Sequence, residues 1–551
     1  MDSQRLILFF VFSFSVFLLL DAWQRDQQPA QPAASASAPA GKSVSPSAQA
    51  PVPSEKLTVP QTAVPLQEPR AAQPGTTVRI ETDLVIAELS TTGGDLRHLQ
   101  FKKHRDTLDK KKDFVLLEAS AERTYIAQSG LIGTGLPNHR STYTASRERY
   151  QLAEGQDSVE VRLVAPAADG MQAAKIYRFH RGSYLIDVGF EIAGSGAGAA
   201  QPFAYFQIVR DGKPPAGDSQ MVPTYTGAAV YTEKEKFQKV AFSDIDKGKT
   251  SYPKHSNDGW IAMLQHYFFS AWLPKNGTPR EFYTRRLEEN LYAAGVIIPA
   301  GTVAAGASAT VMVPFYAGPE EQEKLAKIAP GLELTIDYGW LTVIAVPLFW
   351  VLAWLHQWAG NWGIAIILLT VIIKLLFYPL SAASYRSMAK MRVLAPKLQK
   401  LKDQYGDDRQ RMQQAMMEIY KTEKINPLGG CMPIVIQIPV FIALYWVLLA
   451  SVELRQAPFM LWINDLAAPD PWFILPILMA LTMFVQTWLN PEPPDPVQAK
   501  VMKIMPIVFS IFFFFFPAGL VLYWLVNNVL SIAQQWQITR TLERGAAPRK
   551  R

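Results

Sequence analysis

Hydrophobic and polar residues alternate with a period of two over much of residues 76–318. The clearest run has an apolar residue at every second position, namely Tyr184, Ile186, Val188, Phe190 and Ile192. A period of two places such residues on one face of a β-strand. Turn signals such as Thr92-Gly93-Gly94 separate the runs. We therefore predict that this segment forms a large antiparallel β-sandwich.

Residues 383–425 instead have the three-to-four spacing of an α-helical hairpin. The first arm carries an apolar stripe formed by Met388, Met391, Leu394, Leu398 and Leu401. Gly406 is predicted to end this arm, and Asp407 or Asp408 is a candidate N-cap for the second arm. The hairpin holds ten Lys or Arg residues against five Asp or Glu residues, so it is basic as well as amphipathic.

Long apolar runs predict membrane spans, each of which needs about 20 residues to cross a hydrocarbon core of about 30 Å. The predicted spans are residues 1–23, 362–382, 432–450, 472–489, 501–516 and 518–538. The last two are separated at Pro517-Ala518-Gly519, because the run from Ile504 to Ile538 is too long for a single crossing. The expected architecture is an N-terminal anchor, the β domain and a C-terminal five-span α-helical core.

Residues 319–361 allow two interpretations. Their aromatic residues, including Trp350, Trp354 and Trp358, favour amphipathic helices that lie in the membrane interface. The alternative is an additional span that ends in a turn at Gly360-Asn361. That alternative would place the basic hairpin on the other side of the membrane.

The N-terminal region reads as an anchor followed by a tether. Residues 1–23 are predicted to be an uncleaved signal anchor, because Asp21-Ala22-Trp23 is a poor cleavage sequence. Weak cleavage candidates between Ala33 and Ala38 leave removal of the segment open. Residues 24–75 consist mainly of Pro, Ala, Ser and Gln. Because such a composition buries little apolar surface, we predict a disordered linker.

Charge orients the predicted spans. The chain has 551 residues, 49% of them hydrophobic, and a formal net charge of +7. Basic residues are concentrated in residues 386–424 and in the tail 539–551, as is typical of cytoplasmic segments. With six spans, both termini are expected to lie in the cytoplasm and the β domain outside it. The protein is therefore expected to be a multi-pass membrane protein.

The sequence offers no catalytic, cofactor or metal motif. Lys247-Gly248-Lys249-Thr250 resembles the end of a P-loop, but Ser243 occupies the position where the loop requires glycine. The seven histidines lack metal-ligand spacing, and the single cysteine, Cys431, excludes an intramolecular disulfide. We therefore expect a protein that is not an enzyme and that needs no cofactor.

One charge, Lys374, interrupts the apolar run from Ile364 to Leu380. At about 1.5 Å per residue, it lies about 18 Å inside a span that begins near Trp362. A cation at such a depth costs about 2.5–3.5 kcal/mol on insertion scales. The other apolar runs of the predicted core contain no Asp or Glu. Lys374 must therefore reach water or a lipid headgroup.

Other polar residues recur at helical spacing within the predicted spans. Thr370 and Tyr378 share the helix face of Lys374, and Tyr523, Asn527 and Ser531 share another face. One explanation is ordinary hydrogen bonding between helices, with Lys374 snorkelling toward the cytosol. The other is a hydrated groove that contains Lys374 and opens to the cytosol and to lipid. The residues alone leave both explanations open.

Four motifs carry a resemblance to a known family. They are Asn426-Pro-Leu-Gly-Gly-Cys-Met-Pro433, Gln437-Ile-Pro439, Ser451-Val-Glu-Leu-Arg-Gln-Ala-Pro458 and Phe516-Pro-Ala-Gly-Leu-Val-Leu-Tyr-Trp524. They closely resemble the YidC family of bacterial membrane protein insertases, whose wider group includes mitochondrial and chloroplast insertases. The match covers about Asp337 to Glu543. The preceding anchor, linker and β domain look like the Gram-negative type. This resemblance implies a multi-pass protein of the cell inner membrane, whose periplasmic domain is an antiparallel β-super-sandwich similar to sugar mutarotases.

The resemblance implies a function and a site. Family members insert, fold and assemble integral membrane proteins, alone or with the Sec translocon, through a hydrophilic groove with one essential cation. This role would fall to Lys374, with Thr370, Gln437 and Trp524 lining the groove. The family more often has arginine there, and lysine keeps the charge but loses the planar fork of donors. The resemblance further implies nascent membrane proteins, the ribosome and the lipid bilayer as partners of a monomeric protein.

Two other classes remain as alternatives. A secondary transporter would use Lys374 as an ion or substrate site, and it would need carboxylates or broken helices at the membrane midplane. A membrane-tethered sugar enzyme would need paired carboxylates or histidines in one cleft of the β domain.

Overall fold

The structure is a computed structural model, and it describes residues 64, 75–194, 201–217, 224–405, 408–422, 432–489 and 496–546. The predicted anchor, nearly all of the predicted linker and the segment Asn426–Cys431 lie outside the described residues. The chain forms two compact units. The sandwich unit comprises Lys56–Ala365 and Pro439–Ala468, and the helical unit comprises Ile366–Ile438 and Pro469–Arg551 together with the N-terminal segment.

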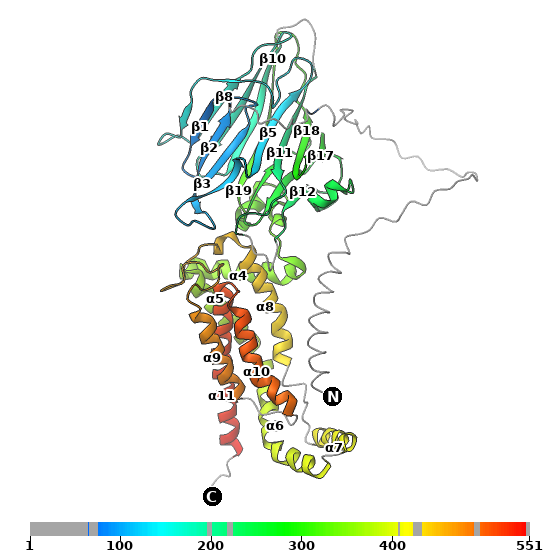
Figure 1. Ribbon diagram of the computed structural model, residues 1–551, viewed down its shortest axis with the longest axis vertical. Helices are drawn as coiled ribbons and strands as arrows, with labels where there is room; N and C mark the ends of the chain where they lie inside the picture. Colours follow the sequence, from blue (N-terminus) through cyan, green and yellow to red (C-terminus); the bar gives the residue numbers. More distant parts are fainter. Residues whose placement is uncertain are drawn as a thin grey trace, which may run out of the picture. The chain divides into compact units, whose positions relative to one another are not determined.

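Two β-sheets make up most of the sandwich unit (Figure 1). The first sheet has the strand order β14-β17-β18-β11-β5-β4-β3-β2-β1-β7. Its strands are β1 Thr77–Glu81, β2 Val85–Ser90, β3 Leu96–Arg105, β4 Asp113–Ala119, β5 Thr124–Ile132, β7 Arg149–Gln151, β11 Phe203–Asp211, β14 His255–Ser256, β17 Arg280–Glu288 and β18 Leu291–Pro299. The pairing of β1 with β7 is parallel, and the other strand pairings described for this sheet are antiparallel.

The second sheet has the strand order β13-β12-β15-β16-β19-β10-β9-β8-β6. Its strands are β6 Thr144–Ala145, β8 Ser158–Val164, β9 Met171–His180, β10 Leu185–Gly194, β12 Gly227–Thr232, β13 Lys236–Val240, β15 Trp260–Gln265, β16 Phe268–Trp272 and β19 Ser308–Pro319. A short helix, α2 (Phe242–Asp246), follows β13. The predicted β-sandwich is confirmed.

The alternating pattern explains how the sheets bury their inner faces. On β10 the residues Ile186, Val188, Phe190 and Ile192 are all at most 2% exposed. The strand pairs in register with β9 on one side and with β19 on the other. Because its apolar face is fixed by period two, a slip of one residue would expose all four side chains.

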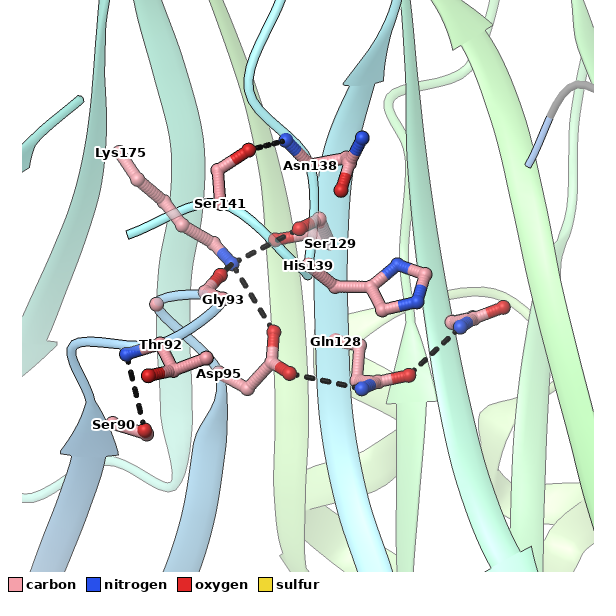
Figure 2. Close-up of polar contacts among 12 residues, drawn as sticks. Ser90, Thr92, Gly93, Asp95, Gln128, Ser129, Asn138, His139, Ser141 and Lys175 are labelled. Carbon is pink, nitrogen blue, oxygen red and sulfur yellow. Dashed lines mark hydrogen bonds and ion pairs between the residues drawn. The ribbon is translucent and has the colours of Figure 1, made fainter. Parts of the chain in front are cut away.

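A buried cation connects the two sheets (Figure 2). Lys175 lies on β9 and is fully buried, yet its ammonium donates hydrogen bonds to the carbonyl oxygens of Gly93 and Ser129, both at 3.0 Å. It also lies 3.6 Å from the carboxylate of Asp95, which precedes β3. Gly94 has a φ of +59°, and a Cβ there would lie 3.0 Å from the Lys175 side chain. The turn therefore needs glycine both for its conformation and for space.

After β19 the chain continues into α3 (Gln322–Ile328), η2 (Leu332–Thr335), η3 (Gly339–Leu341) and α4 (Thr342–Ala359). Trp340, Trp350 and Trp358 of this segment are exposed. Gly339–Ala359 is long and apolar enough to cross a membrane. The segment that we predict to lie in the membrane interface is therefore also long enough and apolar enough to form a membrane span.

The segment after helix α8 (Met432–Ala450) docks on the sandwich. The guanidinium of Arg455 lies 5.4 Å from the ring centres of Phe114 and Phe268 and donates to the carbonyl oxygen of Arg105 at 2.6 Å. Lys110 forms an ion pair with Asp465 at 3.2 Å. We call residues 451–468 the docked loop.

Glu453 is expected to make the docking of this loop depend on pH. Its carboxylate accepts a hydrogen bond from the backbone of Gln322 at 3.3 Å. Burial, together with the nearby carboxylates of Glu321 and Glu323, raises the pKa of Glu453 to about 7, although the hydrogen bond from the Gln322 backbone opposes the rise. A carboxyl whose folded pKa exceeds its unfolded value binds protons preferentially when docked, so docking becomes more stable as pH falls from about 7.5 toward 5.

Hydrogen exchange of the docked loop in the full-length protein measures this effect. Exchange is expected to slow by at least tenfold over that pH range, after correction for intrinsic rates, because the pKa rises from 4.5 to about 7 and one pKa unit corresponds to about 1.4 kcal/mol. Glu453→Gln should remove the dependence, whereas Glu154→Gln, at an exposed position, should keep it. An unchanged pH response in Glu453→Gln would show that another group titrates.

The helical unit contains the remaining helices. They are α5 Trp362–Leu376, whose first turn belongs to the sandwich unit, α6 Tyr378–Tyr405, α7 Arg409–Thr422, α9 Ile474–Leu489, α10 Pro496–Phe513 and α11 Ala518–Ala546, together with the start of α8. Helices α9, α10 and α11 lie side by side in Figure 1. The apolar helices Ile436–Ala450, Ile474–Leu489 and Lys503–Phe513 are shorter than a full span.

A bend of 65° separates α5 from α6. It falls at Phe377, inside the predicted span 362–382 and before the predicted start of the hairpin at residue 383. Pro379 explains the position of the break, because proline lacks an N–H group and its ring disfavours a helical residue before it. Helix α6 therefore joins the end of the predicted span to the first arm of the hairpin.

Candidate functional site

Lys374 lies in the last turn of α5 and is 8% exposed. Its ammonium donates a hydrogen bond of 2.7 Å to the hydroxyl of Ser531 on α11. Among the residues that the structure describes, no carboxylate lies within ion-pair distance of Lys374. The cation is thus held between two helices by a neutral partner.

The partner belongs to a polar stripe on α11. Tyr523, Asn527 and Ser531 follow one another at intervals of four residues, and each is at most 6% exposed. The hydroxyl of Ser531 donates to the carbonyl oxygen of Asn527 at 2.7 Å. The side chain of Gln437 on α8 donates to the Asn527 side chain and, at 3.3 Å, to the hydroxyl of Tyr523. The stripe therefore connects Lys374 with Gln437.

The other two predicted groove residues lie beside this network. Thr370 is on the same face of α5, one turn before Lys374, and is fully buried. Its hydroxyl donates to the carbonyl oxygen of Ile366 at 2.7 Å. Trp524 is half-buried, and its ring centre lies 5.5 Å from that of Phe513 on α10. Of the four predicted residues, the structure links Lys374 and Gln437 through α11.

The sequence identifies the residues that make this link but not the link itself. Tyr523, Asn527 and Ser531 share one helix face by their spacing, which does not reveal the neighbouring helices that this face contacts. Asn528 and Gln535 form a second polar contact, with Thr482 at 3.3 Å and with the carbonyl oxygen of Leu489 at 3.2 Å, both on α9. Helix α11 thus carries polar contacts toward three helices, α5, α8 and α9.

The charge of Lys374 gives the site its chemistry. A hydroxyl partner leaves the positive charge uncompensated, so the site attracts anions such as a carboxylate or a phosphate. An ammonium presents a compact point charge rather than a planar fork, and it therefore accepts anions in several orientations. The geometry favours transient electrostatic attraction over a fixed bidentate contact.

A two-sheet domain followed by apolar helices around a buried cation defines a class of membrane protein with a large extramembrane domain. Residues 77–351 match the family model described as the YidC periplasmic domain. Residues 354–545 match the family model described as the 60Kd inner membrane protein.

Curated relatives match over the whole chain. The membrane protein insertase YidC of Nitrosospira multiformis is 59% identical, with 99% of this chain and 98% of that protein covered. The protein of the same name from Methylobacillus flagellatus is 56% identical, with 100% and 99% covered. The chain therefore belongs to the YidC family.

Solved structures give weaker matches. A crystal structure of an active YidC insertase with its first transmembrane domain resolved has a TM-score of 0.39 at 18% identity, with 84% of this chain and 94% of that chain covered. A galactose mutarotase related enzyme from Lactobacillus acidophilus has a TM-score of 0.29 at 9% identity, with 44% and 97% covered.

Proposed function

We propose that the protein is a membrane protein insertase and chaperone of the inner membrane. Its closely similar relatives carry the insertase name over their full length. The observation that carries the mechanism is the buried Lys374 ammonium, whose bonded partner is the neutral hydroxyl of Ser531. Because this partner carries no charge, the ammonium would attract an acidic segment of a client protein that reaches it.

The mechanism lowers a barrier and does not supply the driving energy. Leu, Ile, Phe and Val each contribute about −0.3 to −0.6 kcal/mol at the centre of a span, so a client helix gains by entering lipid. The obstacle is the polar tail that must cross with it. A hydrated groove shortens the distance that the tail must cross through hydrocarbon, and the charge of Lys374 attracts acidic residues of the tail. The residues that line this groove are Lys374, Thr370, Gln437 and Trp524. The membrane potential, about 2.3 kcal/mol per charge per 100 mV, draws such tails outward.

The proposed topology has six spans, with an N-terminal anchor at residues 1–23 and five spans in the C-terminal region. Both termini lie in the cytoplasm and the β domain lies in the periplasm. The basic residues of the hairpin and the tail support this orientation. The same basic segments are proposed to receive the ribosome and the nascent chain, and the monomeric protein acts alone or with the Sec translocon.

The transporter alternative receives no support from the relatives, which are named insertases. Its ion site would need carboxylates near the cation. Within the described part of the chain, Lys374 has no such partner.

Site-specific crosslinking of a stalled nascent membrane protein tests the proposal. A photo-reactive residue at position 437 or 524 is expected to capture the nascent chain. The same residue at position 488, where Trp488 is 84% exposed on α9, serves as the control and should capture mainly lipid. Equal capture from all three positions would contradict a defined path along α8 and α11.

A further inference from the structure

Val64 is a buried residue within the predicted disordered linker. It is fully buried and packs against Tyr205, Tyr283 and Ile297, with Ile132 and Phe203 at the edge of the cluster. These residues lie on β11, β17, β18 and β5, which are adjacent strands of the first sheet. The composition of the linker predicts no packing, but Val64 within it is enclosed by apolar side chains.

The backbone of Val64 is recognised as well as its side chain. Its carbonyl oxygen accepts a hydrogen bond of 3.2 Å from the guanidinium of Arg285 on β17. The guanidinium lies 5.4 Å from the ring centre of Tyr283 and donates to the side chain of Gln207 at 3.4 Å. A side-chain cluster combined with a fixed donor to a carbonyl is the arrangement that binds an extended peptide.

A buried network holds Arg285 and Gln207 in place. Gln207 accepts a hydrogen bond from Tyr283 at 2.9 Å and donates to Gln128 at 2.8 Å. Gln128 in turn donates to the carboxylate of Asp95 at 2.9 Å, which leads to Lys175 (Figure 2). Because Gln207, Gln128 and Asp95 are buried and bonded to one another, these side chains are held in place before a peptide arrives, which reduces the entropy lost on binding.

We propose that this face of the first sheet is a peptide-docking site whose ligand is the chain's own linker at Val64. Pro65 follows Val64 in the sequence. A residue before proline favours the extended conformation, so this segment loses little entropy on docking. Val64 thereby covers part of Tyr205, Tyr283 and Ile297.

The test uses the full-length protein in lipid nanodiscs and a synthetic peptide of residues 60–68. Val64→Asp places an uncompensated charge in the cluster and is expected to speed hydrogen exchange in β11, β17 and β18 at least tenfold. Val59→Asp, five residues earlier in the same linker, is the matched control and should leave exchange unchanged. The labelled peptide is expected to bind the Val64→Asp protein at least tenfold more tightly than the wild type, whose own linker occupies the site.

The peptide itself supplies the second readout. It should restore slow exchange in the Val64→Asp protein, and a peptide with alanine in place of Val64 should bind about tenfold more weakly, because about two methylene equivalents of apolar burial are lost. Equal exchange in Val64→Asp and Val59→Asp would overturn the proposal. Fast exchange that the peptide fails to reverse would overturn it too, since a vacated docking site is restored by its ligand.

Discussion

Replacing Lys374 by alanine is expected to reduce insertion of a single-span client with an acidic N-terminal tail by about tenfold or more, which corresponds to about 1.4 kcal/mol. Two unit charges 4 Å apart attract by about 4 kcal/mol at the intermediate effective dielectric constant of a partly buried site. Removal of the ammonium abolishes this attraction. The measurement is the yield of protease-protected client in liposomes that contain the purified protein.

Charge and side-chain volume are separated by two further variants. Lys374→Met keeps most of the volume and should be as defective as Lys374→Ala, whereas Lys374→Arg should retain most of the activity. Ser531→Ala removes the hydroxyl that holds the ammonium and is expected to lower the yield by about two- to fivefold, as loss of a hydrogen bond worth about 0.5–1 kcal/mol predicts. Lys421→Ala, at an exposed position on α7, controls for net charge.

The client provides a second test of the same prediction. A client whose tail carries no acidic residues should be inserted almost equally by the wild type and by Lys374→Ala. Normal insertion of the acidic client by Lys374→Ala would remove the charge from the mechanism. An equal loss for both clients would assign Lys374 a structural role between α5 and α11.

The sequence predicted those features of the fold that depend on local periodicity. Ile186, Val188, Phe190 and Ile192 alternate with polar or small residues, and β10 buries all four. The order of the strands in the two sheets could not be predicted, because it depends on contacts between distant segments. The same limit applies to the docked loop, where Arg455 meets Phe114, more than 300 residues earlier in the chain.

The candidate site was predictable to a similar extent. Lys374 stands out in the sequence because it is a lone charge in an apolar run. Ser531 is recognised as its partner only when α5 and α11 are known to be neighbours. The burial of Val64 and of Lys175 likewise depends on their positions in the folded chain. Nothing in the composition around Val64 separates it from Val59, and a lysine within a strand is ordinarily expected at the surface.

The buried pair of Lys175 and Asp95 is expected to be the most sensitive point of the sandwich (Figure 2). Lys175→Met fills a similar volume but leaves the Asp95 carboxylate buried without its cation. Breaking such a pair typically costs about 3–5 kcal/mol, whereas replacing both partners by neutral groups is often nearly neutral. The double variant Lys175→Met with Asp95→Asn should therefore recover most of the stability lost in the single variant.

The pH dependence of these variants distinguishes a charge effect from a packing effect. Burial raises the pKa of Asp95 to about 6, with Lys175 opposing the rise. The folded state thus binds a proton that the unfolded state releases, and stability attributable to Asp95 increases as pH falls from about 6 toward its ordinary value of 3.8. Without Lys175 the rise in pKa is larger, so the defect of Lys175→Met should shrink in acid. Thermal unfolding of the full-length protein between pH 7.5 and 4.5 measures this stability defect. If the double variant is no more stable than Lys175→Met, the defect is caused by lost packing and not by an unpaired carboxylate.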